Sequence, residues 1–96
     1  MLTIDDYCDL AKKHQDFKSD RELAKALSVS QATVSDWRTK RKWPRENLMF
    51  RLSTLAGLDP KIGLIHLAAW KTDGQAHDAF VSIAKGLSEQ KINQFA

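Results

Sequence analysis

Hydrophobic positions between residues 19 and 44 repeat twice with helical spacing, and the interval between the two repeats is long enough only for a turn. The first repeat consists of Leu23, Ala24 and Leu27. Ser19, followed three residues later by Glu22, is the pattern of a capping box and predicts a helix that begins at Asp20. Two helices joined by so short a connection cross steeply and share one small core.

The second repeat contains only two large apolar residues, Val34 and Trp37. Ser30 is a good N-cap, so we expect a helix from residue 31 to about residue 39. Val34 and Trp37 are three residues apart and therefore face the same side, inward. The opposite side carries short or hydrogen-bonding side chains, namely Ala32, Ser35, Asp36 and Thr39, flanked by Gln31. A helix face meant only for solvent would more often carry Glu and Lys.

Basic residues gather directly behind this second helix. Residues 31 to 51 contain six basic and two acidic residues, a balance of +4, so the rest of a chain with net charge +3 has a balance of −1. A concentrated positive patch attracts polyanions better than the same charge spread evenly. A small polar helix face followed by cations suits the major groove of duplex DNA and its phosphates. The alternative is an ordinary solvated, lysine-rich loop.

Further helices are predicted on both sides of this stretch. Thr3 with Asp6 predicts a capped helix from residue 4 to about residue 14. Its buried side should consist of Ile4, Tyr7, Cys8 and Ala11. Pro44 suits the first turn of a fourth helix, which Gly57 should end. The apolar positions of this fourth helix are Leu48, Leu52, Leu55 and Ala56.

The C-terminal part of the chain predicts an antiparallel pair of helices. Asp59 and Pro60 should start a fifth helix, and its sequence IGLIHLAAW is apolar most of the way round, which is typical of a helix between elements or between subunits. A sixth helix is expected from residue 75 to about residue 85. Its apolar stripe consists of Ala76, Ala79, Phe80, Ile83 and Leu87. The tail has a weak helical pattern in Ile92 and Phe95.

Composition restricts the class of protein. Ninety-six residues with 43% hydrophobic and 28% charged residues are ordinary for one globular domain, and only two Pro and four Gly favour helices. The single Cys8 permits no internal disulfide, and His14, His66 and His77 lack the spacing of metal ligands, so we expect no metal and no cofactor. No leader sequence and no apolar run of about 18 residues occurs, which predicts a cytoplasmic protein. No phosphate loop or nucleophile elbow is present, so no enzyme is expected.

The stretch ELAKALSVSQATVSDW resembles the helix-turn-helix of the Cro and CI phage-repressor family, also called XRE-like. The resemblance continues through TKRKWPRENLMFRLSTLAGL and covers roughly residues 3 to 60. The turn position that the family often fills with Gly is Ser28 here, at a cost of about 1 kcal/mol if the left-handed geometry is kept. The resemblance implies an all-α fold of five to six short helices, with a lambda-repressor-like helix-turn-helix core in residues 1–58. Residues 59–96 would form a C-terminal helical extension, either part of the same domain or a dimerisation element.

Four outward residues of the second motif helix are candidates for reading bases. Gln31, which stands where the family places a base contact, can bond bidentately to adenine, Ala32 can touch a thymine methyl, and Ser35 can bond a base edge or a phosphate. Asp36 either accepts from a cytosine amino group or pairs with Lys40 one turn later.

Eight residues are candidates for phosphate contacts: Ser19, Arg21, Thr33, Arg38, Lys40, Arg41, Lys42 and Arg45. The basic ones would neutralise phosphates, and Ser19 and Arg21 begin the first motif helix, where such proteins present backbone N–H groups to a phosphate. Trp43 either wedges against DNA or covers the start of the fourth helix.

These patterns predict a protein that binds double-stranded DNA in a sequence-specific way. The resemblance implies a transcriptional regulator of the phage or prophage repressor type, which binds its operator as a homodimer. A dimer surface is expected from Met49, Phe50, Trp70 and Phe80. The alternative is an adaptor or antitoxin-like protein whose C-terminal helices bind a partner protein, with DNA binding secondary. Neither a membrane nor a small-molecule ligand is expected as a partner.

Overall fold

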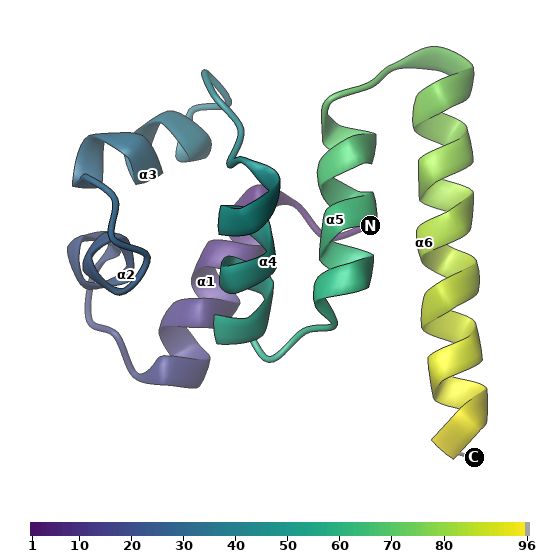
Figure 1. Cartoon of the computed structure of the whole chain (residues 1–96), viewed down its shortest axis with the longest axis horizontal. Helices are drawn as coiled ribbons and strands as arrows, with labels where there is room; N and C mark the ends of the chain where they lie inside the picture. Colours follow the sequence, from purple (N-terminus) through teal and green to yellow (C-terminus); the bar gives the residue numbers. More distant parts are fainter. Residues whose placement is uncertain (96) are drawn as a thin grey trace.

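The computed structural model describes the backbone of residues 1–95 and the side chains of residues 1–88. Over that range every regular element is a helix, which confirms the all-α prediction. The six helices are α1 (Ile4–Gln15), α2 (Asp20–Ala26), α3 (Gln31–Arg38), α4 (Glu46–Leu55), α5 (Pro60–Trp70) and α6 (Gly74–Phe95). The first four gather into one cluster, and α5 and α6 stand beside it as an antiparallel pair (Figure 1).

Side-chain caps start the first two helices. Thr3 and Asp6 form a complete capping box: the Thr3 Oγ1 accepts from the Asp6 N–H at 3.1 Å, and the Thr3 N–H donates to the Asp6 carboxylate at 2.8 Å. The box predicted at α2 is only half formed. The Ser19 hydroxyl accepts from the Glu22 N–H at 3.3 Å, but the Glu22 carboxylate accepts from the N–H of Lys18 rather than that of Ser19.

Two helix bounds differ from the sequence prediction. Helix α4 begins at Glu46, because Arg45 is still extended with ψ 161°, so Pro44 lies buried before the helix rather than in its first turn. Helix α6 continues to Phe95 instead of ending near Lys85. The good helix formers after Gly86 outweigh a single glycine, which costs only about 1 kcal/mol in a helix. The side chains of Ile92 and Phe95 lie outside the described residues.

The core lies between α1, α2, α3 and α4, and it contains the inward residues that the sequence pattern predicted. Its largest members are Ile4, Tyr7, Leu23, Leu27, Val34, Trp37, Met49 and Leu52, none of them more than 1% exposed. Cys8 is also fully buried, and burial raises the pKa of its thiol to about 12. A thiol with so high a pKa is an apolar filler rather than a nucleophile.

Helix α5 extends the core sideways from α4. Gly63 permits this contact, because a Cβ on Gly63 would lie 2.0 Å from the Ser53 Oγ. His66 and Trp70 face α1, where the Tyr7 hydroxyl lies 2.6 Å from the His66 Nδ1 and the Trp70 Nε1 donates to the Leu2 carbonyl at 3.1 Å. The aromatic residues of α5 therefore attach the C-terminal pair to the first helix.

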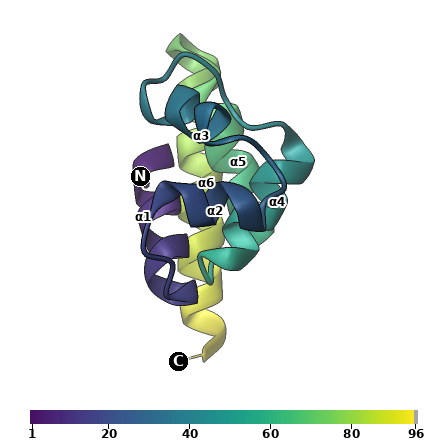
Figure 2. The same ribbon diagram turned by 90° about the vertical axis from the view of Figure 1, so that its left-hand side faces the viewer.

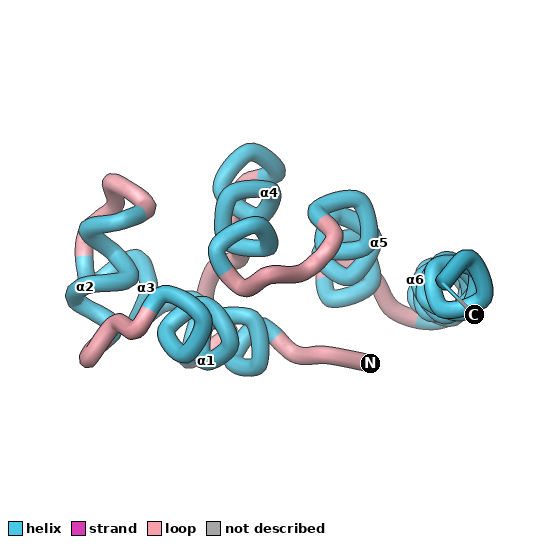
Figure 3. Tube along the Cα trace, turned by 90° about the horizontal axis from the view of Figure 1, so that it is seen from below, coloured by secondary structure: helices cyan, strands magenta, loops and turns pink. Residues whose placement is uncertain are grey.

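Helix α6 is the outermost element, and among the described residues its only helix contacts are with α5. Seen from below, α2 and α3 lie at one end of the molecule and α6 at the other (Figure 3). None of the helices in the described part of the chain is long and apolar enough to cross a membrane.

The side of α6 that packs on α5 is not the predicted stripe. Ala84 is 2% exposed, and the His77 Nδ1 lies 2.7 Å from the Ala69 carbonyl, whereas Ile83 is 47% and Leu87 37% exposed. Ala76 and Ala79 are exposed as well. The spacing of the large apolar residues predicted a helix correctly but not which side of it faces α5. That side carries Ala84, because a small residue permits the closest approach of two helices.

Candidate nucleic-acid interface

The turn between α2 and α3 has the left-handed geometry expected of this motif. Ser28 has φ +58°, and two reversed hydrogen bonds close the end of α2, from the Ser28 N–H to the Lys25 carbonyl at 3.1 Å and from the Val29 N–H to the Ala24 carbonyl at 3.0 Å. This is a Schellman motif, whose left-handed position is usually glycine. A serine therefore holds a conformation that costs an L-residue about 1 kcal/mol.

The rotation of α3 about its axis follows from its cap and its two anchors. The Ser30 hydroxyl accepts from the Thr33 N–H at 3.2 Å and bonds the Thr33 hydroxyl at 2.9 Å. Val34 and Trp37 are buried in the core, where α3 packs on α1 and α2. Thr33, one of the phosphate candidates, is half-buried, with its hydroxyl engaged by the cap.

The outer side of α3 is open, as the sequence pattern predicted. Gln31, Ala32 and Ser35 are exposed and Asp36 is half-buried, so the four base-reading candidates lie together on one accessible surface. The Thr39 hydroxyl donates to the Ser35 carbonyl at 3.1 Å and closes the last turn. Helices α2 and α3 occupy the face shown in Figure 2, with α3 near the end at which α6 begins.

A second reversal ends α3 and directs the basic loop. Lys40 has φ +63°, its N–H donates to the Trp37 carbonyl at 3.2 Å, and the Arg41 N–H donates to the Asp36 carbonyl at 2.9 Å. The chain then turns away from the helix axis. Arg41, Lys42 and Arg45 follow this reversal, and all three are exposed.

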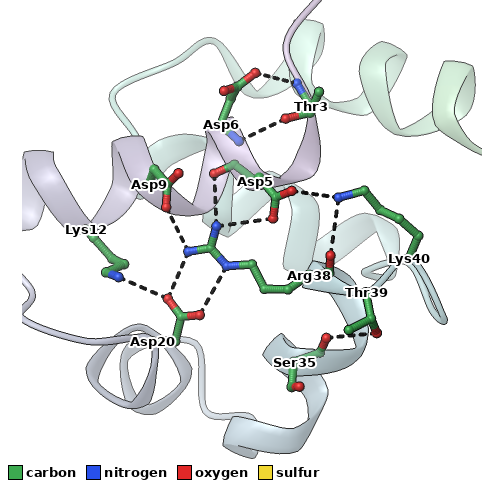
Figure 4. Close-up of polar contacts among 10 residues, drawn as sticks. All are labelled: Thr3, Asp5, Asp6, Asp9, Lys12, Asp20, Ser35, Arg38, Thr39 and Lys40. Atoms are coloured by element: carbon green, nitrogen blue, oxygen red, sulfur yellow. Dashed lines mark hydrogen bonds and ion pairs between the residues drawn. The ribbon is translucent and has the colours of Figure 1, made fainter.

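Arg38 lies in a cluster of carboxylates rather than at the surface (Figure 4). Its guanidinium bonds both oxygens of Asp20, at 3.1 and 2.9 Å, and it also reaches Asp9 at 2.8 Å and Asp5 at 3.2 Å. The Arg38 side chain is only 21% exposed. It therefore connects α3 to α1 and α2, and its donors are engaged within the protein.

Lys40 belongs to the same cluster, which corrects the predicted pair between Asp36 and Lys40. The Lys40 Nζ lies 2.8 Å from Asp5, because the left-handed backbone at Lys40 turns its side chain towards α1. Asp36 instead lies 3.9 Å from the Lys42 Nζ, at the limit of an ion pair.

The cluster shifts the titration of its carboxyl groups. The hydrogen bond from Lys40, together with those from Arg38, holds the pKa of Asp5 below its usual value. The hydrogen bond from Arg38, helped by one from Lys12, does the same for Asp20. These carboxylates therefore remain charged at neutral pH, and the cations they hold stay engaged.

The start of α2 carries the remaining phosphate candidates. Ser19 is half-buried and serves as the cap of its helix, whereas Arg21 is exposed. Arg21, Arg41, Lys42 and Arg45 are thus exposed, whereas Arg38 and Lys40 are paired with carboxylates of α1 and α2, Arg38 half-buried and Lys40 still exposed.

Arg51 has a structural role that the sequence patterns did not reveal. Its guanidinium donates to the Leu27 carbonyl at 3.3 Å and to the Ala26 carbonyl at 3.0 Å, at the C-terminal end of α2. A cation there satisfies unpaired carbonyls and complements the helix dipole. The only signal in the sequence is that Arg51 is the one basic residue of α4, and the carbonyls it caps lie 24 and 25 residues away.

Trp43 covers the junction between the loop and the C-terminal pair. It is half-buried, and its ring stacks on Trp70 with the centroids 5.7 Å apart and an interplanar angle of 25°. The ring of Trp43 thus packs on α5, through Trp70, whereas the partners expected from the sequence were the start of the fourth helix or DNA. The dimer surface expected from the sequence also changes, because Met49 is fully buried and Trp70 is half-buried beneath Trp43.

No group of three or more His, Cys, Asp or Glu residues suited to a metal ion occurs in the part of the chain that the structure describes. The geometry is instead that of a helix-turn-helix with an open outer helix face and exposed cations beside it. These are the features with which such motifs approach the major groove and the DNA backbone.

Comparison with known proteins agrees with this geometry. The model of a family described as the bacteriophage CI repressor helix-turn-helix domain matches residues 9–59, just over half of the chain. No curated protein and no solved structure matches the sequence. The matched residues include α2, the turn at Ser28, α3, the basic loop and α4. The chain therefore belongs to the bacteriophage CI repressor helix-turn-helix domain family.

Proposed function

We propose that this protein is a transcriptional repressor of the phage or prophage type that binds a specific operator in duplex DNA. The observation that carries the proposal is the open outer side of α3, where Gln31, Ala32 and Ser35 are exposed beside the exposed cations Arg41 and Lys42. Short side chains let a helix approach base edges closely, and cations next to it suit the phosphates that border the groove.

Base reading is assigned to the four residues of the outer side of α3. Gln31 stands at the first position of the helix and bonds the N6 and N7 edge of an adenine. Ser35 bonds a base edge one turn later, and Ala32 contacts a thymine methyl. Asp36, which is half-buried and within 3.9 Å of Lys42, accepts from a cytosine amino group where its pairing leaves an oxygen available.

Phosphate contacts are assigned to Arg21, Arg41, Lys42 and Arg45, which are exposed around α3. The hydroxyls of Ser19 and Thr33 are secondary candidates, since both already serve as or bond to helix caps. Arg38 and Lys40 are left out, because their donors are engaged by Asp5, Asp9 and Asp20. Four phosphate contacts give a slope of about −3 to −4 for log affinity against log salt per subunit.

The operator-binding form is proposed to be a homodimer on two related half-sites, as is usual for helix-turn-helix proteins that read short half-sites. Occlusion of a promoter by such a dimer would repress transcription in the bacterial cytoplasm, where operators are found.

Selection of bound sequences from random duplex DNA tests this function. We expect a consensus with two related half-sites, and Gln31→Ala should relax the preference at one position in each half-site. The double variant Arg41→Ala, Lys42→Ala should lose most affinity for every sequence, whereas Lys61→Ala, an exposed lysine on α5, should bind normally. Recovery of no consensus by the folded protein would refute operator recognition.

A further inference from the structure

Helix α6 has two apolar sides, and only one of them is covered. The covered side, with His77 and Ala84, packs on α5. The second side consists of Ala76, Phe80, Ile83 and Leu87. At about 100° per residue it lies roughly a quarter turn around the helix from the first. Among the described residues only four large hydrophobic side chains are exposed, and Ile83 and Leu87 are two of them.

The second side of α6 is continuous with an apolar groove on α5. Leu64, Leu67 and Ala68 of α5 line this groove together with Phe80 of α6, and its volume is about 340 Å³. Two charged groups at its edge, the Lys71 Nζ and the Glu46 carboxylate, lie 3.8 Å apart and balance each other. The groove and the second side of α6 therefore form one surface without net charge, which we call the hairpin surface.

Two antiparallel helices that each have a further apolar side about a quarter turn from their mutual contact have the shape of half a four-helix bundle. The other half must offer the same chemistry, another uncharged antiparallel pair. We propose that a second copy of this chain supplies it, so that the α5–α6 pairs of two copies form an antiparallel four-helix bundle. In this bundle α6 of one copy lies against α5 of the other, and Ile83 and Leu87 are covered.

The arrangement of the helices defines the direction of the two-fold axis. Helix α3 and the loop after it lie at the same end of the molecule as the start of α6, and the end of α6 lies at the opposite end (Figures 1 and 2). A two-fold axis parallel to α6, which is the axis of the proposed bundle, keeps both α3 helices at one end, where a single duplex can meet them. A perpendicular axis would place them at opposite ends. This part of the inference rests on the proposed DNA-binding function.

The size of the surface predicts a weak dimer. The overlap is limited by α5, whose 11 residues span about 16 Å, so a contact two helices wide covers on the order of 300–400 Å² per copy. A standard interface covers about 800 Å² per partner. We therefore expect dissociation constants of about 10–100 µM without DNA.

Sedimentation equilibrium of the full chain without DNA tests the dimer. We expect a monomer–dimer equilibrium, and Ile83→Asp should raise the dissociation constant at least about tenfold, because it places a charge in an apolar contact. Ser82→Asp is the matched control, since Ser82 is exposed about 130° around α6 from the second apolar side and the same charge there should change nothing. Circular dichroism verifies that both variants keep their helices, as the exposure of Ile83 predicts.

The chain remaining monomeric at about 300 µM, or equal weakening by Ser82→Asp and Ile83→Asp, would overturn the proposal. If the chain remains monomeric, the hairpin surface would bind a protein other than a second copy of this chain. The result is independent of the proposed function, because no DNA is present. The Ile83→Asp monomer should still bind a single half-site through α3.

Half-site spacing gives a second readout. Helices α3 and α6 lie towards opposite ends of the longest dimension of the molecule, which is 35 Å (Figure 3). The two-fold axis of the proposed bundle lies between the two α5–α6 pairs, so each α3 is less than 35 Å from the axis and the two α3 helices are less than about 70 Å, or two DNA turns, apart. A selected operator with half-sites more than two turns apart would overturn the proposed bundle.

Discussion

Arg38 donates two hydrogen bonds to the Asp20 carboxylate, from its Nε at 3.1 Å and its Nη2 at 2.9 Å, and so joins the two helices of the motif. A bidentate pair holds the planar guanidinium in one orientation. The same group reaches Asp5 and Asp9 on α1 (Figure 4). One side chain therefore fixes the angle at which α3 is presented.

Arg38→Met should lower the free energy of unfolding by about 2 kcal/mol. It leaves Asp5, Asp9 and Asp20 close together without their shared cation, and the cost is less than that of a fully buried pair because the site is partly exposed. Urea denaturation at pH 7 measures the change. Arg41→Met, at an exposed arginine of the loop, should stay within about 0.5 kcal/mol. Equal effects of the two substitutions would contradict the structural role of Arg38.

The same two variants should behave in the opposite way towards DNA. At a temperature where both are folded, Arg41→Met should reduce the magnitude of the slope of log affinity against log salt by about 0.9, the contribution of one phosphate contact. Arg38→Met should leave the slope unchanged, since its guanidinium is already neutralised within the protein. Fluorescence anisotropy with an operator duplex at several salt concentrations measures both. A smaller slope for Arg38→Met would return this residue to the phosphate contacts.

Features that depend on neighbouring residues were predictable from the sequence. Val34 and Trp37, three residues apart, determine the rotation of α3, and Ser30 determines where the helix begins. The sequence alone therefore predicts which side of α3 is open. The ion-pair partners of Arg38 could not be predicted, because they lie 18 to 33 residues away in the sequence. A charge pattern does not specify which carboxylate a cation contacts. The predicted rotation of α6 was wrong for a related reason: the helix has two apolar sides, and the sequence alone does not show which of them packs on α5.

Ser28→Gly should stabilise the protein by about 1 kcal/mol. Ser28 has φ +58°, where an L-residue is strained and glycine is not, and the change removes only an exposed hydroxyl. Thermal unfolding followed by circular dichroism measures the gain. Ser28→Ala keeps the strained backbone and should bring no such gain. Stabilisation by alanine equal to that by glycine would show that the backbone conformation is not the cause.

Gly63→Ala should destabilise the protein by about 2 kcal/mol or more, because the new Cβ would lie 2.0 Å from the Ser53 Oγ and force α4 and α5 apart. Gly86→Ala is the matched control within a helix, since a Cβ there meets nothing within 4 Å. That variant should gain up to about 1 kcal/mol from helix propensity alone. Adding Ser53→Ala to Gly63→Ala should recover part of the loss, and urea denaturation of all four proteins provides the comparison. No recovery would place the strain elsewhere than at this crossing.

The Tyr7 hydroxyl and the His66 Nδ1 lie 2.6 Å apart in the core between α1 and α5, and this pair predicts a pH dependence of stability. Burial, together with the positive N-terminus, holds the pKa of His66 below its ordinary value, so the folded protein favours the neutral ring in its hydrogen bond with Tyr7. Below about pH 6.5 the unfolded chain binds a proton that the folded state does not. The contribution of neutral His66 to the free energy of unfolding is therefore complete above that pH. It falls as the pH decreases towards the pKa of His66 in the folded state, by at most about 1.4 kcal/mol per pH unit.

His66→Gln removes the titration while keeping a hydrogen-bonding side chain at that position. The difference in unfolding free energy between the original protein and this variant should become less favourable to the original protein as the pH decreases from 7 to 5. His14 and His77 are present in both proteins, so their contributions cancel in the difference. Urea denaturation at half-unit pH intervals measures it. A difference that stays constant over this range would mean that His66 titrates equally in the folded and unfolded states, and the core would then hold the charged ring as readily as the neutral one.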